Sequence, residues 1–208
     1  MSADASAAAP PSIPSRPSAA PPWELILLGL TVLSLALIPV EIHRAFGLPA
    51  HPLLIHIPVI LVPLVGVAAL ALMARPAWIE RHGLLVGIFA VAATAATILA
   101  VGAGEALRAD RGGGPPGEAA AIDAHASAGE TLRILIVLFT LALLGTLYAR
   151  RRALASPAML GLRVLVAALA IASVFFVIRT GHLGAKLTWG GGEGGGGGGP
   201  PPAFRFGG

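Results

Sequence analysis

The sequence predicts an all-α protein, a polytopic transmembrane bundle of five helices. Hydrophobic residues make up 56% of the 208 residues, charged residues make up only 12%, and the mean hydropathy is +0.84. Too few polar side chains are present to cover a water-facing surface. The chain also contains five continuous apolar runs, each close to the roughly 20 residues that a helix needs to cross a bilayer.

The apolar runs divide the chain into an added first helix and a four-helix domain. The first run covers residues 23–42, and the four-helix domain is assigned to residues 43–189. The second run covers residues 52–73, in which Pro58 and Pro63 each delete an internal hydrogen bond and should bend the helix. The last three runs cover residues 83–102, 130–148 and 158–178.

The segments outside these runs are predicted from their composition. Residues 1–22 are rich in Pro, Ala and Ser and should be disordered, and residues 190–208 are a flexible tail rich in Gly and Pro. The longest connection, residues 103–129, follows the third run. Within it, residues 117–130 have a helical composition and are expected to extend the fourth helix beyond the membrane.

Composition also excludes several functions. The chain has no Cys, which removes disulfides, thiolate metal sites and iron–sulfur clusters. The net charge of +4 comes from scattered Arg residues at the ends of apolar runs, a pattern typical of membrane anchoring and not of nucleic-acid binding. No nucleophile motif or acid–base pair stands out, which argues against an enzyme.

The basic residues predict an orientation. The triplet Arg150–Arg152 lies in a short loop, where positive charge marks the cytoplasmic side. We therefore expect a cytoplasmic N-terminus and a C-terminus on the outer side. Five of the six histidines then fall on the outer side: His43, His51, His56, His125 and His182.

The histidines on this face predict three kinds of site. A haem b between His56 and His125, with Arg133 or Arg179 near its propionates, is the sharpest hypothesis. Zn or Cu held by several side chains is the second. A structural hydrogen-bond network without a cofactor is the third. The metal-ligand candidates are His51, His56, His125, His182 and Glu105.

Three stretches resemble a bacterial membrane family known as domain of unknown function 2231. Residues 47–58 contain HPLLIHIP, similar to the HPLLVHFP-like opening of that family. AGE at 103–105, followed by His125 and by Gly-Glu at 129–130, resembles its AGE…H…GE pattern. TGHLG at 180–184 resembles its closing TGHLGG segment, with Ala185 in place of the second glycine.

The resemblance covers about residues 47–190 and implies a four-helix membrane domain, to which this chain adds a first helix and a Gly-rich tail. It implies no activity. The motif-matching positions are His51, His56, Glu105, His125, Glu130 and His182.

The sequence thus predicts a multi-pass bacterial inner-membrane protein, with a periplasmic His/Glu cluster that binds haem or a metal for electron transfer. The alternative is a non-catalytic structural or assembly subunit without a cofactor. The predicted partners are the lipid bilayer and an unidentified redox or membrane-complex partner, and nucleic acid is not among them.

Overall fold

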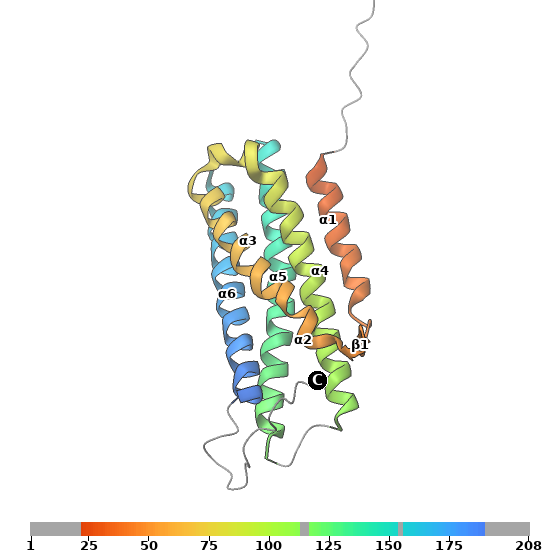
Figure 1. Ribbon diagram of the computed structural model, residues 1–208. Helices are drawn as coiled ribbons and strands as arrows, with labels where there is room; N and C mark the ends of the chain where they lie inside the picture. Colours follow the sequence, from red (N-terminus) through yellow and green to blue (C-terminus); the bar gives the residue numbers. More distant parts are fainter. Residues whose placement is uncertain (1–21, 113–116, 154–155, 190–208) are drawn as a thin grey trace, which may run out of the picture.

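The protein is a helical bundle, as the sequence predicts. The computed structural model describes residues 22–112, 117–153 and 156–189. Both predicted tails fall outside these ranges, apart from Pro22. Within them, four helical stretches are long and apolar enough to cross a membrane: Ala50–Ala74, Pro76–Asp110, Ala119–Arg151 and Pro157–Trp189. They stand side by side, and the N-terminal helix packs along one flank (Figure 1).

The N-terminal helix α1 (Trp23–Ser34) is shorter than the sequence predicted. It continues only as a 3-10 turn, η1 (Leu35–Leu37), and does not reach residue 42. Pro39 explains why the α-helix does not continue, because it has no N–H to donate to the Leu35 carbonyl. That carbonyl accepts from Ile38 N–H at 3.1 Å instead, in a 3-10 turn. The 15 residues Trp23–Leu37 span about 22 Å, less than the roughly 30 Å hydrocarbon core.

A small hairpin that the sequence analysis missed joins α1 to the bundle. Strand β1 (Arg44–Ala45) pairs antiparallel with β2 (Leu48–Pro49). The two turn residues, Phe46 and Gly47, have φ values of 51° and 77°. Positive φ at both central residues is typical of the two-residue turns whose twist matches a hairpin.

The second predicted helix forms as two pieces. Helix α2 (Ala50–Leu54) and helix α3 (His56–Ala74) are separated by the single residue Ile55. Pro58 has no N–H for the Leu54 carbonyl, so the hydrogen-bond ladder is interrupted at this point. The predicted bend is therefore a break one turn before Pro58, and Pro63 lies inside the continuous part of α3.

The three remaining helices extend well beyond the predicted membrane runs. After the 3-10 turn η2 (Pro76–Trp78) they are α4 (Ile79–Asp110), α5 (Ala119–Arg151) and α6 (Ser156–Trp189). The expectation of a long connection over residues 103–129 was wrong, because helix occupies most of it and only residues 111–118 join α4 to α5. The predicted helical extension before residue 130 is confirmed, and it is continuous with α5.

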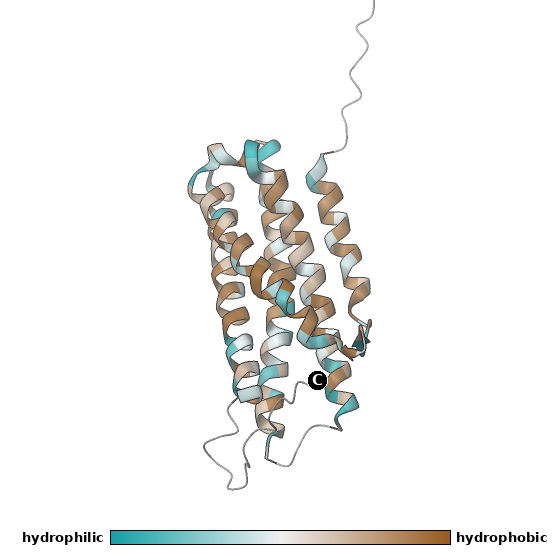
Figure 2. Cartoon of the chain, viewed as in Figure 1, coloured by the Kyte–Doolittle hydropathy of each residue, from teal (hydrophilic) through white to brown (hydrophobic). Residues whose placement is uncertain are grey.

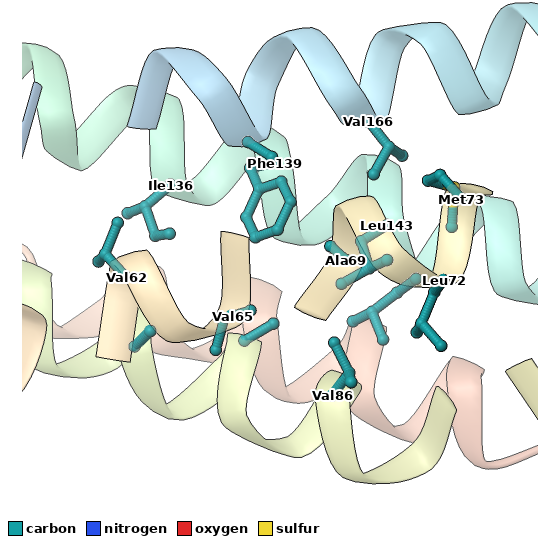
Figure 3. Close-up of a cluster of buried hydrophobic side chains, with 14 of the residues drawn as sticks. Val62, Val65, Ala69, Leu72, Met73, Val86, Ile136, Phe139, Leu143 and Val166 are labelled. Carbon is teal, nitrogen blue, oxygen red and sulfur yellow. The ribbon is translucent and has the colours of Figure 1, made fainter. Parts of the chain in front are cut away.

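The core lies along the inner faces of α3 and α5. Ile136, Phe139 and Leu143 on α5 recur at helical spacing and are fully buried against Val62 and neighbouring residues of α3 (Figure 3). Near the middle of the bundle, the hydroxyl groups of Thr94 and Thr140 hydrogen-bond at 2.8 Å between α4 and α5.

Hydrophilic residues gather mainly at the two ends of the bundle, while the residues along its sides are mostly hydrophobic (Figure 2). Large apolar side chains face outward along α3 and α6, among them Ile60 (64% exposed) and Ile171 (60% exposed). Such outward-facing side chains suit lipid contact in a membrane protein.

Candidate functional site

A cavity of about 1160 Å³ lies between α2, α4, α5 and α6, at the end of the bundle that also carries the hairpin. One part of its wall is apolar and contains Ala100, Val101, Leu132 and Val177. We call the opposite part, where exposed charged residues gather, the polar end; it contains Arg108, Arg111, Glu118 and Asp123. Two of the predicted histidines and both predicted glutamates also line the cavity: His51, His125, Glu105 and Glu130.

His51 is half-buried in the short helix α2 and reaches across to α4. Its Nδ1 lies 2.8 Å from the carbonyl oxygen of Ala100. A carbonyl oxygen only accepts hydrogen bonds, so Nδ1 carries the proton and donates. The ring rests on Gly104, where an added Cβ would lie 3.0 Å from both Cε1 and Nδ1 of the imidazole. Glycine at 104 therefore makes room for the ring.

His125 repeats this arrangement between α5 and α6. Its Nδ1 donates to the carbonyl oxygen of Thr180 at 3.1 Å. Its ring rests on Gly184, where an added Cβ would lie 3.0 Å from Cε1. In both cases the accepting carbonyl and the supporting glycine are four residues apart, so each lies one helical turn from the other.

The two imidazole rings lie beside one another, edge to face, at the cavity wall. Their centroids are 6.0 Å apart and their planes are nearly perpendicular, at 84°. With Nδ1–H engaged by a backbone carbonyl, the neutral ring keeps its lone pair on Nε2. A backbone carbonyl on the outer nitrogen is the usual support of a metal-binding histidine. Each ring therefore keeps its Nε2 available as a hydrogen-bond acceptor or as a metal ligand.

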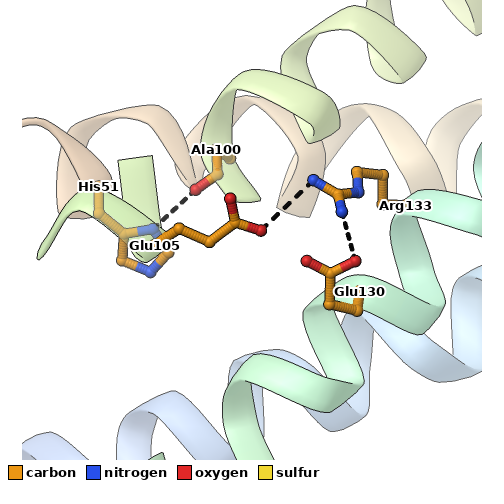
Figure 4. Close-up of polar contacts among 5 residues, drawn as sticks. All are labelled: His51, Ala100, Glu105, Glu130 and Arg133. Carbon is orange, nitrogen blue, oxygen red and sulfur yellow. Dashed lines mark hydrogen bonds and ion pairs between the residues drawn. The ribbon is translucent and has the colours of Figure 1, made fainter. Parts of the chain in front are cut away.

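A charged cluster stands beside His51. Arg133 on α5 lies between two carboxylates, with its Nη1 3.4 Å from Glu105 and its Nη2 2.5 Å from Glu130 (Figure 4). The Arg133 side chain is 16% exposed. The guanidinium of Arg133 is therefore ion-paired with both carboxylates. Arg133 does not line the cavity.

The structure does not bring every predicted residue to the cavity. His56 is exposed, and its Nδ1 contacts the Leu53 carbonyl of the preceding turn at 3.3 Å. His182 is exposed as well, and Arg179 lies over the Phe176 ring at 5.8 Å. None of these three lines the cavity, so His51 and not His56 is the residue that meets His125.

The predicted Zn or Cu ligands do not converge as one set. Within residues 22–112, 117–153 and 156–189, no group of three or more His, Asp or Glu side chains is arranged to hold a metal ion. Of the five candidates, only His51, His125 and Glu105 share the cavity wall.

Sequence analysis missed four residues of this site. Gly104 and Gly184 support the two rings, and Arg108 and Arg111 line the polar end. A signal was present in the spacing, since Gly104, Arg108 and Arg111 recur at intervals of four and three and share one helix face.

Comparison with known proteins places the chain in a family. The model of the family described as "Predicted membrane protein (DUF2231)" matches residues 47–194. The chain belongs to the DUF2231 family. This confirms the family that the sequence suggested, and helix α1 precedes the part that matches the DUF2231 model. No curated protein and no solved structure matches the chain.

Proposed function

We propose that this protein carries electrons in the membrane through a b-type haem held between His51 and His125. The single observation that carries the proposal is the paired geometry of the two rings, 6.0 Å apart and each fixed through Nδ1 to a backbone carbonyl. The proposal keeps His125 from the sequence hypothesis and replaces His56 with His51.

The separation of the rings fits two ligands on opposite sides of one iron. An imidazole nitrogen binds a transition metal at about 2 Å and lies about 1.2 Å from its own ring centre, so two such rings have centroids about 6 Å apart. The separation of 6.0 Å between the ring centroids supports this arrangement.

The number of ligands favours haem over Zn or Cu. A protein site for Zn needs three or four side chains, whereas a porphyrin supplies four nitrogens and leaves only two axial positions for the protein. The cavity of 1160 Å³ exceeds the roughly 300–1,000 Å³ of pockets that enclose drug-sized ligands. Haem iron alternates between its ferric and ferrous states, which gives the protein a one-electron carrier.

The test is a reduced-minus-oxidised absorption spectrum of the detergent-purified protein, with iron measured on the same sample. We expect a Soret band and close to one iron per chain. His51→Ala and His125→Ala should each abolish or shift the band. His56→Ala and His182→Ala are matched controls on the same face and should leave it unchanged. A flat spectrum without iron, or a band unaffected by both ligand variants, would refute the proposal.

A second candidate is a structural or assembly subunit without a cofactor. The observation in its favour is that each imidazole ties two helices together, α2 to α4 through His51 and α5 to α6 through His125. In that case the purified protein is colourless and free of metal. His51→Ala and His125→Ala then lower only its thermal stability, by roughly 1 kcal/mol for each hydrogen bond lost.

We also propose that the protein resides in a bacterial inner membrane with the His51–His125 site toward the periplasm. The short connection with Arg150–Arg152 supports a cytoplasmic position for that end of the bundle. The absence of native Cys makes the test direct, because a single Cys introduced at Gly112 or at Ala153 is the only thiol. In intact cells, a membrane-impermeant maleimide should label the Gly112→Cys protein and not the Ala153→Cys protein. The reverse pattern would overturn this orientation.

A further inference from the structure

One face of α4 grades from apolar to cationic along the cavity. Ala100, Gly104, Arg108 and Arg111 follow one another at intervals of four, four and three residues, so they lie on one stripe of the helix. All four line the cavity. Ala100 is buried beside His51, whereas both arginines are exposed at the polar end.

The residues of this stripe match a haem in length and in polarity. A haem is a flat apolar ring with two carboxylates on one edge. Gly104 marks the level of the His51 ring, and Arg108 and Arg111 lie about 6 Å and about 10 Å farther along the helix axis. A haem held by the two imidazoles would have Arg108 and Arg111 on one side to receive its carboxylates and apolar side chains such as Ala100 on the other.

We propose that Arg111, assisted by Arg108, binds the haem propionates and fixes the haem with its carboxylates toward the polar end. This inference rests on the haem proposed above. Arg108 already pairs with Asp123 at 2.5 Å, so it can contribute only part of its donors. In the part of the chain that the structure describes, no carboxylate lies within ion-pair distance of Arg111, which leaves its five donors available for a carboxylate.

The two arginines that the sequence suggested are worse placed for this role. The guanidinium of Arg133 is occupied by Glu105 and Glu130, and Arg179 lies over Phe176 away from the cavity. Glu118 and Asp123 are the acidic residues of the polar end, and their negative charges repel a propionate. A direct contact with an arginine is therefore needed for a carboxylate to bind there.

The test compares haem b with its dimethyl ester, in which both propionates are uncharged. Apoprotein in detergent is titrated with each compound, and the Kd is read from the Soret absorbance. We expect Arg111→Gln to weaken binding of haem b about tenfold, the effect typical of one lost charge-assisted hydrogen bond, and to leave ester binding unchanged. Arg111→Lys should recover part of the affinity, and Arg179→Gln, the matched control, should behave as wild type.

The outcomes separate the two proposals. If Arg111→Gln binds haem b as tightly as wild type does, or loses affinity for haem b and for the ester alike, the assignment of Arg111 is overturned while the His51–His125 site stands. If the wild-type apoprotein binds neither compound, the haem proposal fails and this inference fails with it.

Discussion

The support that Gly184 gives to His125 can be tested against a neighbouring glycine of the same helix. Gly184 and Gly181 both lie in α6, so alanine at either position gains up to about 1 kcal/mol of intrinsic helix stability. At Gly181 an added Cβ meets nothing within 4 Å, and Gly181→Ala should stabilise the protein by about this amount. At Gly184 the new Cβ would lie 3.0 Å from Cε1 and 3.5 Å from Nδ1 of His125.

The cost of Gly184→Ala follows from these distances. Carbon atoms in ordinary contact are about 3.5–4.0 Å apart, so the His125 ring must move by about 0.5 Å. That movement stretches its 3.1 Å hydrogen bond to Thr180, worth about 1 kcal/mol, and overpacking of this kind costs about 1–3 kcal/mol more. After the gain in helix propensity, Gly184→Ala should lose about 1–3 kcal/mol.

The assay is reversible unfolding in mixed detergent micelles, followed by circular dichroism. Gly181→Ala should unfold at a higher denaturant fraction than wild type, and Gly184→Ala at a lower one, with about 2–4 kcal/mol between the two variants. The Gly184→Ala protein should also bind haem less tightly, because the ring has been displaced. Equal stabilities for the two alanine variants would refute the role given to Gly184.

Three further predictions concern the packing of the bundle. Gly102→Ala would bring its new Cβ into a clash with the carbonyl oxygen of Val40, so it should lower the free energy of unfolding by about 1–3 kcal/mol. It should also increase protease cleavage in the segment before the hairpin. Arg151→Gln removes the guanidinium that pairs with the Glu24 carboxylate, which is 2% exposed, and should lower the free energy of unfolding by about 2–3 kcal/mol in the same assay. Adding Glu24→Gln should recover part of this loss. A double variant no more stable than the single one would contradict the ion pair. Thr140→Val removes the hydroxyl pair in the middle of the bundle and should cost about 0.6–1.7 kcal/mol, whereas an unchanged unfolding midpoint would show that this bond contributes nothing.

The fold was largely predictable because few backbone structures are stable inside a lipid bilayer. A chain that must satisfy its backbone groups internally forms helices wherever an apolar run is long enough, and the five helices were predicted on this basis. Their ends were less predictable. Hydropathy reports where the membrane begins and does not report where the helix stops, so α4 and α5 continue through residues that the apolar runs exclude. Pro39 carried a signal for the end of α1 that hydropathy obscured.

The choice between His51 and His56 needed the three-dimensional structure. His51 directly precedes the second apolar run and His56 lies near its beginning. Five residues of ideal helix separate them by about 140°, so at most one can face a given neighbour. An unbroken helix gives no reason to prefer either. In the structure, His51 in α2 reaches the Ala100 carbonyl, whereas His56 at the beginning of α3 is exposed.

The two halves of the site are equivalent, and this equivalence explains the matched depth of the two rings. Each half consists of a histidine near the beginning of one helix, a carbonyl on the partner helix, and a glycine four residues later: Ala100 and Gly104 for His51, Thr180 and Gly184 for His125. The carbonyl fixes the ring through Nδ1, and the glycine fixes how closely the ring approaches the partner helix. This arrangement occurs twice, once between α2 and α4 and once between α5 and α6. Together the two copies place two imidazole Nε2 atoms at one cavity. A purely structural hydrogen bond needs the carbonyl but not a second imidazole beside the first at a cavity wall. The paired arrangement therefore favours a ligand that takes both rings at once.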